Sequence, residues 1–288
     1  MDEEMIEKVF RVEGIPPEEG KRFLEKFRAI PPMNFAVIKV SGECLETDES
    51  KNAITKGLNF LFSLGLYPIV IHGAGKGIDR AMHEKGLKIK KVGGLRFTGK
   101  KTLKIVMDVS GKVNAEFVGA LNDFEPVAEG LVGKKIFIAE PLEEKKYGFV
   151  GEVKIVKLSD IKKAVSGKRI PVVPFFGFKG KQAYNINADE AANHLVKAVK
   201  PAKFIVFTEV GGVLDKNGKV ISELDIQGMQ EMIESGAATE GMKVKLEQII
   251  ELMHKMPNGF RVHITSPKKF IRELFTDKGS GTLVCKRL

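Results

Sequence analysis

The 288 residues, 43% of them apolar, are enough to bury a substantial core, which excludes a disordered or fibrous chain. The formal charge of +10 comes from lysines scattered along the chain without an aromatic-rich patch, so we expect no nucleic-acid partner and favour anionic small molecules. Two cysteines, no leader-like opening and no apolar run near the roughly 20 residues that cross a bilayer predict a cytoplasmic protein without a disulfide framework or a membrane partner.

The N-terminal segment predicts two short amphipathic helices that lie outside the core. Apolar positions recur at helical spacing around Phe10 and Phe27, and turn residues at 14–17 separate the two patterns. A pair of prolines ends the segment. We therefore expect a mobile helical extension over 1–33 and a main domain over 34–288.

The main domain alternates apolar, β-branched runs with helical patterns, which is typical of crossover units on a mainly parallel sheet. Four runs are apolar on both alternations, as strands covered on both faces must be; they are 35–38, 68–71, 170–173 and 204–207. Helical spacing covers 53–64, 78–84, 103–121, 189–199 and 242–253. Short strand-like segments over 134–156 predict a β-rich flap. The predicted fold class is α/β, a three-layer αβα sandwich.

Two loops that follow the first two predicted strands have the composition of anion sites. Lys39 and Gly42 put a cation and a close-approach glycine at the carboxyl end of the sheet, where open α/β folds bind ligands. Gly73, Ala74 and Gly75 open a helix after the second strand, so their backbone N–H groups can hold anionic oxygens at its positive end. Taken alone, each loop also fits an ordinary strand-to-helix turn.

Arg96 lies in a segment, 94–101, that comes within one residue of the P-loop pattern. Lys101 stands where a Ser or Thr must reach magnesium, and the preceding segment is charged, which excludes a P-loop. The guanidinium of Arg96 can still hold a carboxylate through two parallel hydrogen bonds, and a plain surface arginine is the alternative.

Two asparagines and an acid mark a junction between a loop and a helix. The spacing puts Asn185 and Asn187 together and lets Asp189 open the helix. This suits polar recognition with an acid that orients a lysine, although helix capping alone also explains Asp189. Lys243 and Lys245 begin a later helix, and only one of them can face a cleft.

The segment after the fourth predicted strand predicts a nucleotide contact. Thr208, Glu209, Gly212 and Leu214 belong to a glycine-containing turn, where bare backbone lets an adenine or a phosphate approach; a plain hairpin is the alternative. The histidines and cysteines show no metal-ligand spacing, so no protein-held metal is expected. No Gly-x-Ser-x-Gly elbow follows a strand, so a covalent serine nucleophile is not indicated.

The order of these motifs resembles that of the N-acetylglutamate kinases, which are of the amino-acid kinase type. The matching blocks are 39–42, 72–75, 94–98, 185–189 and 241–245, and 273–282 is similar to the family's arginine-responsive signature. Ala74 and the segments 147–152 and 264–267 resemble the branch that fuses this kinase domain to an acetyltransferase. We expect the acetyltransferase to be absent here.

The resemblance implies an amino-acid kinase fold with an acceptor-binding lobe over about 34–168 and a nucleotide-binding lobe over about 169–288. The N-terminal extension is similar to the segment that links dimers into rings in arginine-sensitive members. A homo-oligomer, a dimer or larger, is therefore expected.

The resemblance also implies a role for each motif residue. Lys39 and Lys245 would flank the transferring phosphoryl group, and Asp189 would orient both lysines. The acceptor would be held by Gly73, Ala74, Gly75, Arg96 and Asn185. The nucleotide would be held by Gly42, Thr208, Glu209, Gly212 and Leu214. Effector arginine would be held by Glu273, Gly279 and Gly281. ATP would bring Mg²⁺ with it, bound mainly through the nucleotide.

These roles imply ATP-dependent phosphorylation of the side-chain carboxylate of N-acetyl-L-glutamate, a step of arginine biosynthesis, with arginine as a regulator. No general base is needed because the acceptor is already ionised. Two alternatives stay open, with Ser41 and Lys76 supporting the first. One is a catalytically silent arginine sensor, and the other is a kinase for another acylated amino acid, carbamate or a phosphate monoester.

Overall fold

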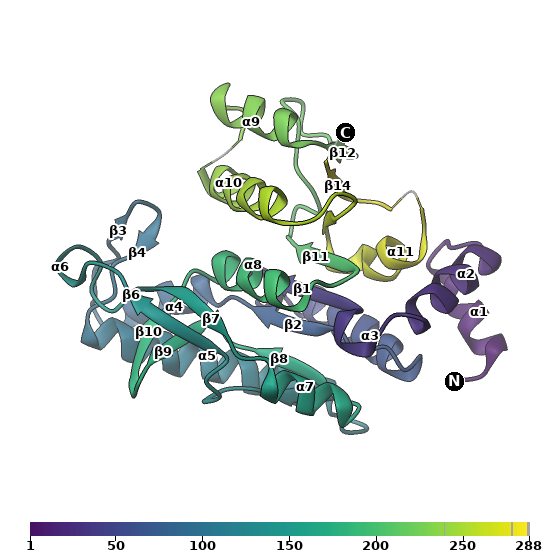
Figure 1. Cartoon of the computed structure of the whole chain (residues 1–288), viewed down its shortest axis with the longest axis horizontal. Coiled ribbons are helices and arrows are strands. Elements are labelled where there is room, and N and C mark those ends of the chain that lie inside the picture. Colours follow the sequence, from purple (N-terminus) through teal and green to yellow (C-terminus); the bar gives the residue numbers. More distant parts are fainter. Residues whose placement is uncertain (239, 278, 287–288) are drawn as a thin grey trace.

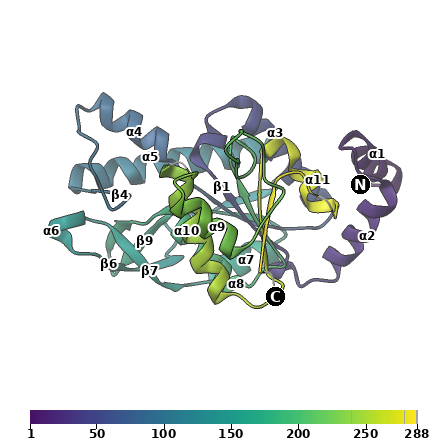
Figure 2. The same cartoon turned by 90° about the horizontal axis from the view of Figure 1, so that it is seen from above.

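The computed structural model describes residues 1–238, 240–277 and 279–286, so Lys278, in the predicted arginine-responsive segment, lies outside the described residues. Within these ranges an eight-stranded sheet forms the middle layer and helices cover both of its faces (Figure 1, Figure 2). In spatial order its strands are β12 (Glu223–Leu224), β14 (Thr282–Cys285), β13 (Arg261–Thr265), β11 (Lys203–Phe207), β1 (Ala36–Val40), β2 (Ile69–His72), β8 (Ile170–Val173) and β5 (Ala128–Gly130).

The sheet is mainly parallel, since β14 pairs antiparallel with β13 and the other described neighbours pair in parallel. The four strands predicted from apolar runs are β1, β2, β8 and β11, at the centre of the sheet, so those predictions are confirmed. Successive residues of each strand point to opposite faces, which divides the apolar core into two clusters.

Helices cover the two clusters from opposite sides. The helices α3 (Asp48–Ser63) and α11 (Phe270–Phe275) pack on one face, and α8 (Ala188–Val199) and α10 (Glu240–Lys255) pack on the other. The other helices of the main domain are α4 (Gly75–Glu84), α5 (Lys100–Leu121), α6 (Glu144–Tyr147), α7 (Ser159–Ser166), α9 (Ile226–Glu234) and the short 3-10 segments η1 (Pro32–Asn34), η2 (Gly42–Leu45) and η3 (Pro267–Lys269). This arrangement is the predicted three-layer αβα sandwich, with the five predicted helices present.

A second sheet of four strands stands beside the main one in the described chain. Its spatial order is β10 (Gln182–Asn185), β9 (Phe176–Lys179), β6 (Phe137–Pro141) and β7 (Gly151–Val156). The antiparallel pair β6 and β7 is the predicted flap. The β9–β10 hairpin was not predicted, and it delivers Asn185 to the junction with α8. A two-stranded hairpin, β3 (Lys91–Val92) with β4 (Leu95–Arg96), lies nearby.

The N-terminal segment forms the two predicted helices, α1 (Glu3–Val12) and α2 (Pro17–Arg28). The expectation that they lie outside the core was wrong, because Phe10 and Phe27 are almost fully buried and both rings contact Phe275. Both helices contribute to the cluster under α3 and α11. Large aromatic rings on their inner faces explain the packing, since burying such rings is strongly favourable.

None of the helices in the described ranges has the length and apolarity that a membrane crossing requires.

Candidate active site

A cleft of about 540 Å³ opens at the carboxyl ends of β1, β2 and β11. These strands are parallel neighbours, so the loops that follow them meet at one edge of the sheet. The predicted site residues that line the cleft are Lys39, Gly42, Gly73, Ala74, Gly75, Arg96, Asn185, Asp189, Thr208, Glu209 and Lys245. Most residues singled out from separate motifs therefore share one cavity.

Asp189 binds the two predicted lysines with different carboxylate oxygens. The Nζ of Lys39 lies 2.6 Å from Oδ1, and the Nζ of Lys245 lies 3.9 Å from Oδ2. The helix cap is Asn187, whose side-chain oxygen accepts a hydrogen bond from the backbone N–H of Asp189. Capping therefore does not explain the acid, whose carboxylate is left to orient the lysines. Lys243 is exposed, so only Lys245 of that pair faces the cleft, as predicted.

The charges of this triad shift the pKa values of Asp189 and Lys245. Burial alone would raise the pKa of Asp189, but the positive charges of Lys39 and Lys245 outweigh it and lower that pKa below its ordinary value. The charge of Lys39 also lowers the pKa of Lys245. The carboxylate is therefore ionised at neutral pH and holds two cations close together against their mutual repulsion.

The two glycine loops touch each other at the floor of the cleft. A Cβ atom placed on Gly42 would lie 3.0 Å from the backbone nitrogens of Ala74 and Gly75, so only glycine lets the chains come this close. Ala74 precedes α4, and that helix has no side-chain cap. Backbone N–H groups at the positive end of a helix are thus available to an anion beside Lys39.

Arg96 and Asn185 line the acceptor side of the cleft through contacts with neighbouring residues. The guanidinium of Arg96 pairs with Asp79 and donates to the carbonyl of Gly75 at 3.4 Å. The amide of Asn185 donates to the hydroxyl of Thr98 at 3.0 Å. Both side chains are only partly exposed, so their polar ends are held in place rather than left to move in solvent.

The four predicted nucleotide contacts from the β11 loop divide into two groups. Thr208 and Glu209 line the cleft. Gly212 lies further along, where a Cβ would come within 2.5 Å of Val220, and Leu214 forms a bridge with the same residue. The second pair therefore supports the turn between β11 and β12 instead of lining this cavity.

Two cleft residues that the sequence analysis associated with a silent sensor have local partners. The hydroxyl of Ser41 lies 3.1 Å from the sulfur of Cys44. Burial raises the pKa of the Cys44 thiol to about 11, so this neighbour stays uncharged. Lys76 forms an ion pair of 3.1 Å with Glu43 at the rim. Both side chains line the cleft and each has a partner within the protein.

The predicted arginine residues lie together in a separate part of the fold. Glu273 is buried, and its Oε2 accepts hydrogen bonds from the backbone N–H of Ser280 at 2.8 Å and of Gly281 at 3.1 Å. Gly279 has φ +56°, and a Cβ there would lie 2.7 Å from Glu273. Glycine at 279 is thus required by both conformation and space.

A cavity of about 350 Å³ beside Glu273 contains residues that the sequence analysis missed. Lys203 and His263 line it, and the Nδ1 of His263 lies 2.8 Å from a Glu273 oxygen. Burial lowers the pKa of Lys203 to about 8. The sequence signal for them is a polar residue within an otherwise apolar strand. Lys203 stands at the start of β11, and His263 stands in the middle of β13.

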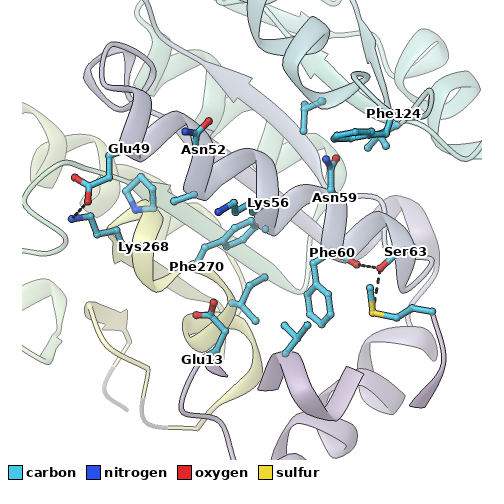
Figure 3. Close-up of a pocket in the computed structure, with 18 of the residues that line it drawn as sticks. Glu13, Glu49, Asn52, Lys56, Asn59, Phe60, Ser63, Phe124, Lys268 and Phe270 are labelled. Atoms are coloured by element: carbon cyan, nitrogen blue, oxygen red, sulfur yellow. Dashed lines mark hydrogen bonds and ion pairs between the residues drawn. The ribbon is translucent and has the colours of Figure 1, made fainter. Parts of the chain in front are cut away.

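A larger groove of about 870 Å³ shares no lining residue with the cleft or with the cavity beside Glu273. Figure 3 shows α3 crossing it, with Phe60 and Phe270 on one side and Phe124 on the other. Phe124 is 97% exposed. The groove therefore offers apolar surface outside the cleft.

A sequence model of the amino acid kinase family matches residues 34–266. The chain belongs to the amino acid kinase family. The match begins two residues before β1 and ends in the segment after β13, so it spans the strands that build the cleft.

Relatives within the amino acid kinase family share about a third of the residues. An acetylglutamate kinase of Xylella fastidiosa (strain 9a5c) is 38% identical over 93% of this chain, and the chain spans only 63% of that relative's length. An acetylglutamate kinase of Campylobacter hominis is 34% identical, with 91% of this chain and 93% of the relative covered.

Solved structures share the fold. The N-acetylglutamate synthase of Neisseria gonorrhoeae, solved with coenzyme A and N-acetyl-glutamate, superposes with a TM-score of 0.82 at 20% identity. That comparison covers 94% of this chain and 63% of the synthase chain. At such low identity it bears on the fold alone, which agrees with the three layers described above.

Proposed function

We propose that the chain transfers the γ-phosphoryl group of ATP to the side-chain carboxylate of N-acetyl-L-glutamate. The observation that carries the proposal is the bridge from Lys39 through Asp189 to Lys245 at the carboxyl edge of the sheet. Relatives at 38% and 34% identity that are named acetylglutamate kinases support the choice of acceptor. The chain spans less than two thirds of the first of these, so the activity of the longer protein is not assumed for this one.

The chemistry follows from charge and position. A carboxylate attacking a phosphoryl group brings negative charge close to negative charge, and two cations held by one acid can offset the repulsion as the bond forms. The N–H groups of Gly42, Ala74 and Gly75 suit the phosphoryl oxygens, because this floor is built of close-approaching backbone. No residue has to remove a proton from the acceptor.

The acceptor would lie on the side of Arg96 and Asn185. Arg96 would exchange its partner Asp79 for the α-carboxylate, which a guanidinium can bind through two hydrogen bonds. Asn185 has an amide that suits the acetamido group. The partial exposure of both side chains supports recognition without a large rearrangement.

ATP would lie on the side of Thr208 and Glu209, with Gly212 and Leu214 supporting the loop. Among the described residues, no group of three or more carboxylate, histidine or cysteine side chains offers a metal cage, which fits a Mg²⁺ held mainly by the phosphates and water. When bound, such an ion neutralises phosphate charge. Lys39 and Lys245 would approach the same phosphates from the protein side.

The test is ADP release from magnesium-ATP and N-acetylglutamate, with hydroxylamine present to trap an acyl phosphate. Formation of an acyl hydroxamate that depends on both substrates supports the proposal. If no product forms while arginine still raises the thermal stability, the chain is a silent sensor instead. Turnover with carbamate, another acylated amino acid or a phosphate monoester, and none with N-acetylglutamate, would reassign the acceptor.

We also propose that free arginine binds beside Glu273. The buried carboxylate suits a guanidinium, while Lys203, which lines the same cavity, suits the carboxylate of an amino acid. Saturating arginine should raise the melting temperature by a few degrees, and the uncharged analogue citrulline should not. Equal shifts from both ligands, or a full shift in Glu273→Gln, would refute this placement.

A homo-oligomer is proposed as well, with the N-terminal extension contributing to it. The outer face of α1 leaves Met5 and Val12 exposed, which supports a further contact surface. The acceptor lobe over about 34–168 and the nucleotide lobe over about 169–288 remain part of the same proposal, since the cleft draws residues from both ranges.

A further inference from the structure

His72 is a buried ring directly before the glycine loop, and the proposed chemistry does not use it. It is fully buried at the end of β2. Its two ring nitrogens contact two different polar groups. Nε2 lies 3.0 Å from the amide nitrogen of Asn114, and Nδ1 lies 3.3 Å from the carbonyl oxygen of Gly73.

The neighbours of Asn114 determine which ring nitrogen carries the proton. The amide nitrogen of Asn114 also lies 3.1 Å from the carbonyl oxygen of Val172, which can only accept. That atom of Asn114 must therefore be the NH₂ group, and its second hydrogen is directed at Nε2 of His72. Nε2 must then accept, so the proton of the neutral ring sits on Nδ1.

A proton on Nδ1 completes a hydrogen bond to the Gly73 carbonyl. The backbone N–H of Gly73 already donates to the carbonyl of Val40 at 2.9 Å. Both polar groups of Gly73 are thus fixed, one to β1 and one to the ring. Within the described part of the chain, no helix N–H bonds to the Gly73 carbonyl, so the ring is its partner.

The peptide that follows is oriented by the same contact. In a planar trans peptide the N–H of Ala74 points opposite to the carbonyl of Gly73. Ala74 lines the cleft, and its nitrogen lies close to Gly42 on the phosphate side. Turning the Gly73 carbonyl toward the buried ring therefore turns the Ala74 N–H outward, toward the site of the anion.

We propose that His72 is a positioning residue, held by Asn114 as the neutral Nδ1–H tautomer, which aims the Ala74 N–H at the transferring phosphoryl group. The aiming role rests on the proposed kinase function, whereas the tautomer does not. The ring stays uncharged because burial lowers the pKa of His72 to about 4. Protonation of Nε2 would also turn two donors toward each other.

The tautomer has a direct spectroscopic test on the unmodified chain. In protein labelled with ¹⁵N-histidine, long-range proton–nitrogen correlation distinguishes a protonated from an unprotonated ring nitrogen, and loss of one signal set in His72→Asn assigns the residue. The expected result is a protonated Nδ1 and a bare Nε2 for His72, unchanged through the neutral pH range. A protonated Nε2, or a ring that titrates there, would overturn the proposal.

The positioning role is tested with two substitutions of His72 that differ in whether they keep a hydrogen-bond donor at the place of Nδ1. His72→Asn retains a donor near the place of Nδ1, whereas His72→Leu removes it. We expect kcat to fall about 10- to 100-fold in His72→Leu, with KM for both substrates nearly unchanged and partial recovery in His72→Asn. His83→Leu, on an exposed turn of α4, is the matched control and should keep full activity.

A remote variant keeps the test informative if His72→Leu does not fold. A Cβ on Gly130, in the edge strand β5, would lie 2.5 Å from the side-chain oxygen of Asn114. Gly130→Ala should therefore displace Asn114, mix the two tautomers and lower kcat. Normal kcat in a variant whose tautomers are mixed would refute the positioning role. If His72 of the unmodified chain shows the predicted tautomer but the chain forms no acyl phosphate, the kinase function is refuted instead.

Discussion

The carboxylate of Asp189 forms ion pairs with two lysines that belong to different elements. Lys39 comes from a buried central strand and is 4% exposed, whereas Lys245 comes from the first turns of α10 and is 21% exposed. The first contact is short and fixed by packing. The second is longer, at 3.9 Å, and involves the more exposed of the two lysines.

The exposure of the side chains gives a prediction for the two lysines near the start of α10, Lys243 and Lys245. Lys245→Ala should lower kcat by about 10²- to 10³-fold, because it removes a cation from the developing charge. Lys243→Ala removes a cation from the same helix two residues away, but its side chain is exposed, so kcat should stay near the unmodified value. Steady-state kinetics at saturating ATP checks both variants. Equal losses would mean that net charge alone matters.

A second prediction at this scale concerns Lys203 and stability. Its pKa is 10.5 as a free side chain and about 8 in the fold, because burial disfavours the charged form. Between these values the unfolded chain binds more protons, so this group makes stability rise as pH increases from about 8 to 10.5. Lys203→Met should raise the melting temperature at pH 7 and flatten that rise. An unchanged pH profile of thermal unfolding would contradict the burial cost.

At the scale of elements, α1 and α2 join distant parts of the chain through aromatic rings. The centroid of the Phe10 ring lies 6.0 Å from that of Phe60 in α3 and 5.1 Å from that of Phe275 in α11. A Cβ on Gly20 would lie 2.5 Å from the Phe10 ring, so α2 closes tightly over it. The N-terminal helices therefore stabilise the same layer that carries the C-terminal helix.

Removing the central ring should cost stability without touching the cleft. Phe10→Ala should lower the free energy of unfolding by about 3–5 kcal/mol, the usual cost of deleting a fully buried phenylalanine. Val12→Ala, on the exposed side of the same helix, should change it by less than about 0.5 kcal/mol. Urea unfolding followed by circular dichroism compares the two. Similar losses in both would mean that α1 is only loosely attached.

The elements also explain what the sequence could predict. Central strands such as β1 and β11 are apolar on both faces, so periodicity alone identified them. β13 contains Arg261 and His263, and β9 and β10 are each only partly buried and end in or contain polar residues, so none of the three matched the pattern of a strand covered on both sides. Packing of α1 could not be predicted, because a helical pattern shows which face is apolar but not what covers it.

The site shows the same division. Lys39 and the glycine loops were predictable, because residues that follow parallel strands must meet at one edge of the sheet. The cap formed by Asn187 is a local contact with residue 189, and the spacing of the motif did not decide which of the two residues caps the helix. The partners of Arg96 and Glu273 lie on other elements, and the sequence does not show which elements meet.

At the scale of the whole molecule, the exposed apolar side chains include Val12 of α1 and Phe124, which borders the groove of Figure 3. If the N-terminal extension mediates assembly, Val12→Asp should reduce the mass found by light scattering, whereas Phe124→Asp should not. The opposite result would move the contact to the groove. A monomeric unmodified chain would remove the oligomer altogether.

Segments made early in synthesis pack against segments made late, which limits when their contacts can form during translation. β1 cannot gain its neighbour β11 until residue 207 has been made, and the rings of Phe10 and Phe27 wait for Phe275. β14 then enters between β12 and β13. A nascent chain therefore carries Phe10 and Phe27 without their partner Phe275 through most of its translation, and we expect it to bind chaperones that recognise exposed apolar segments.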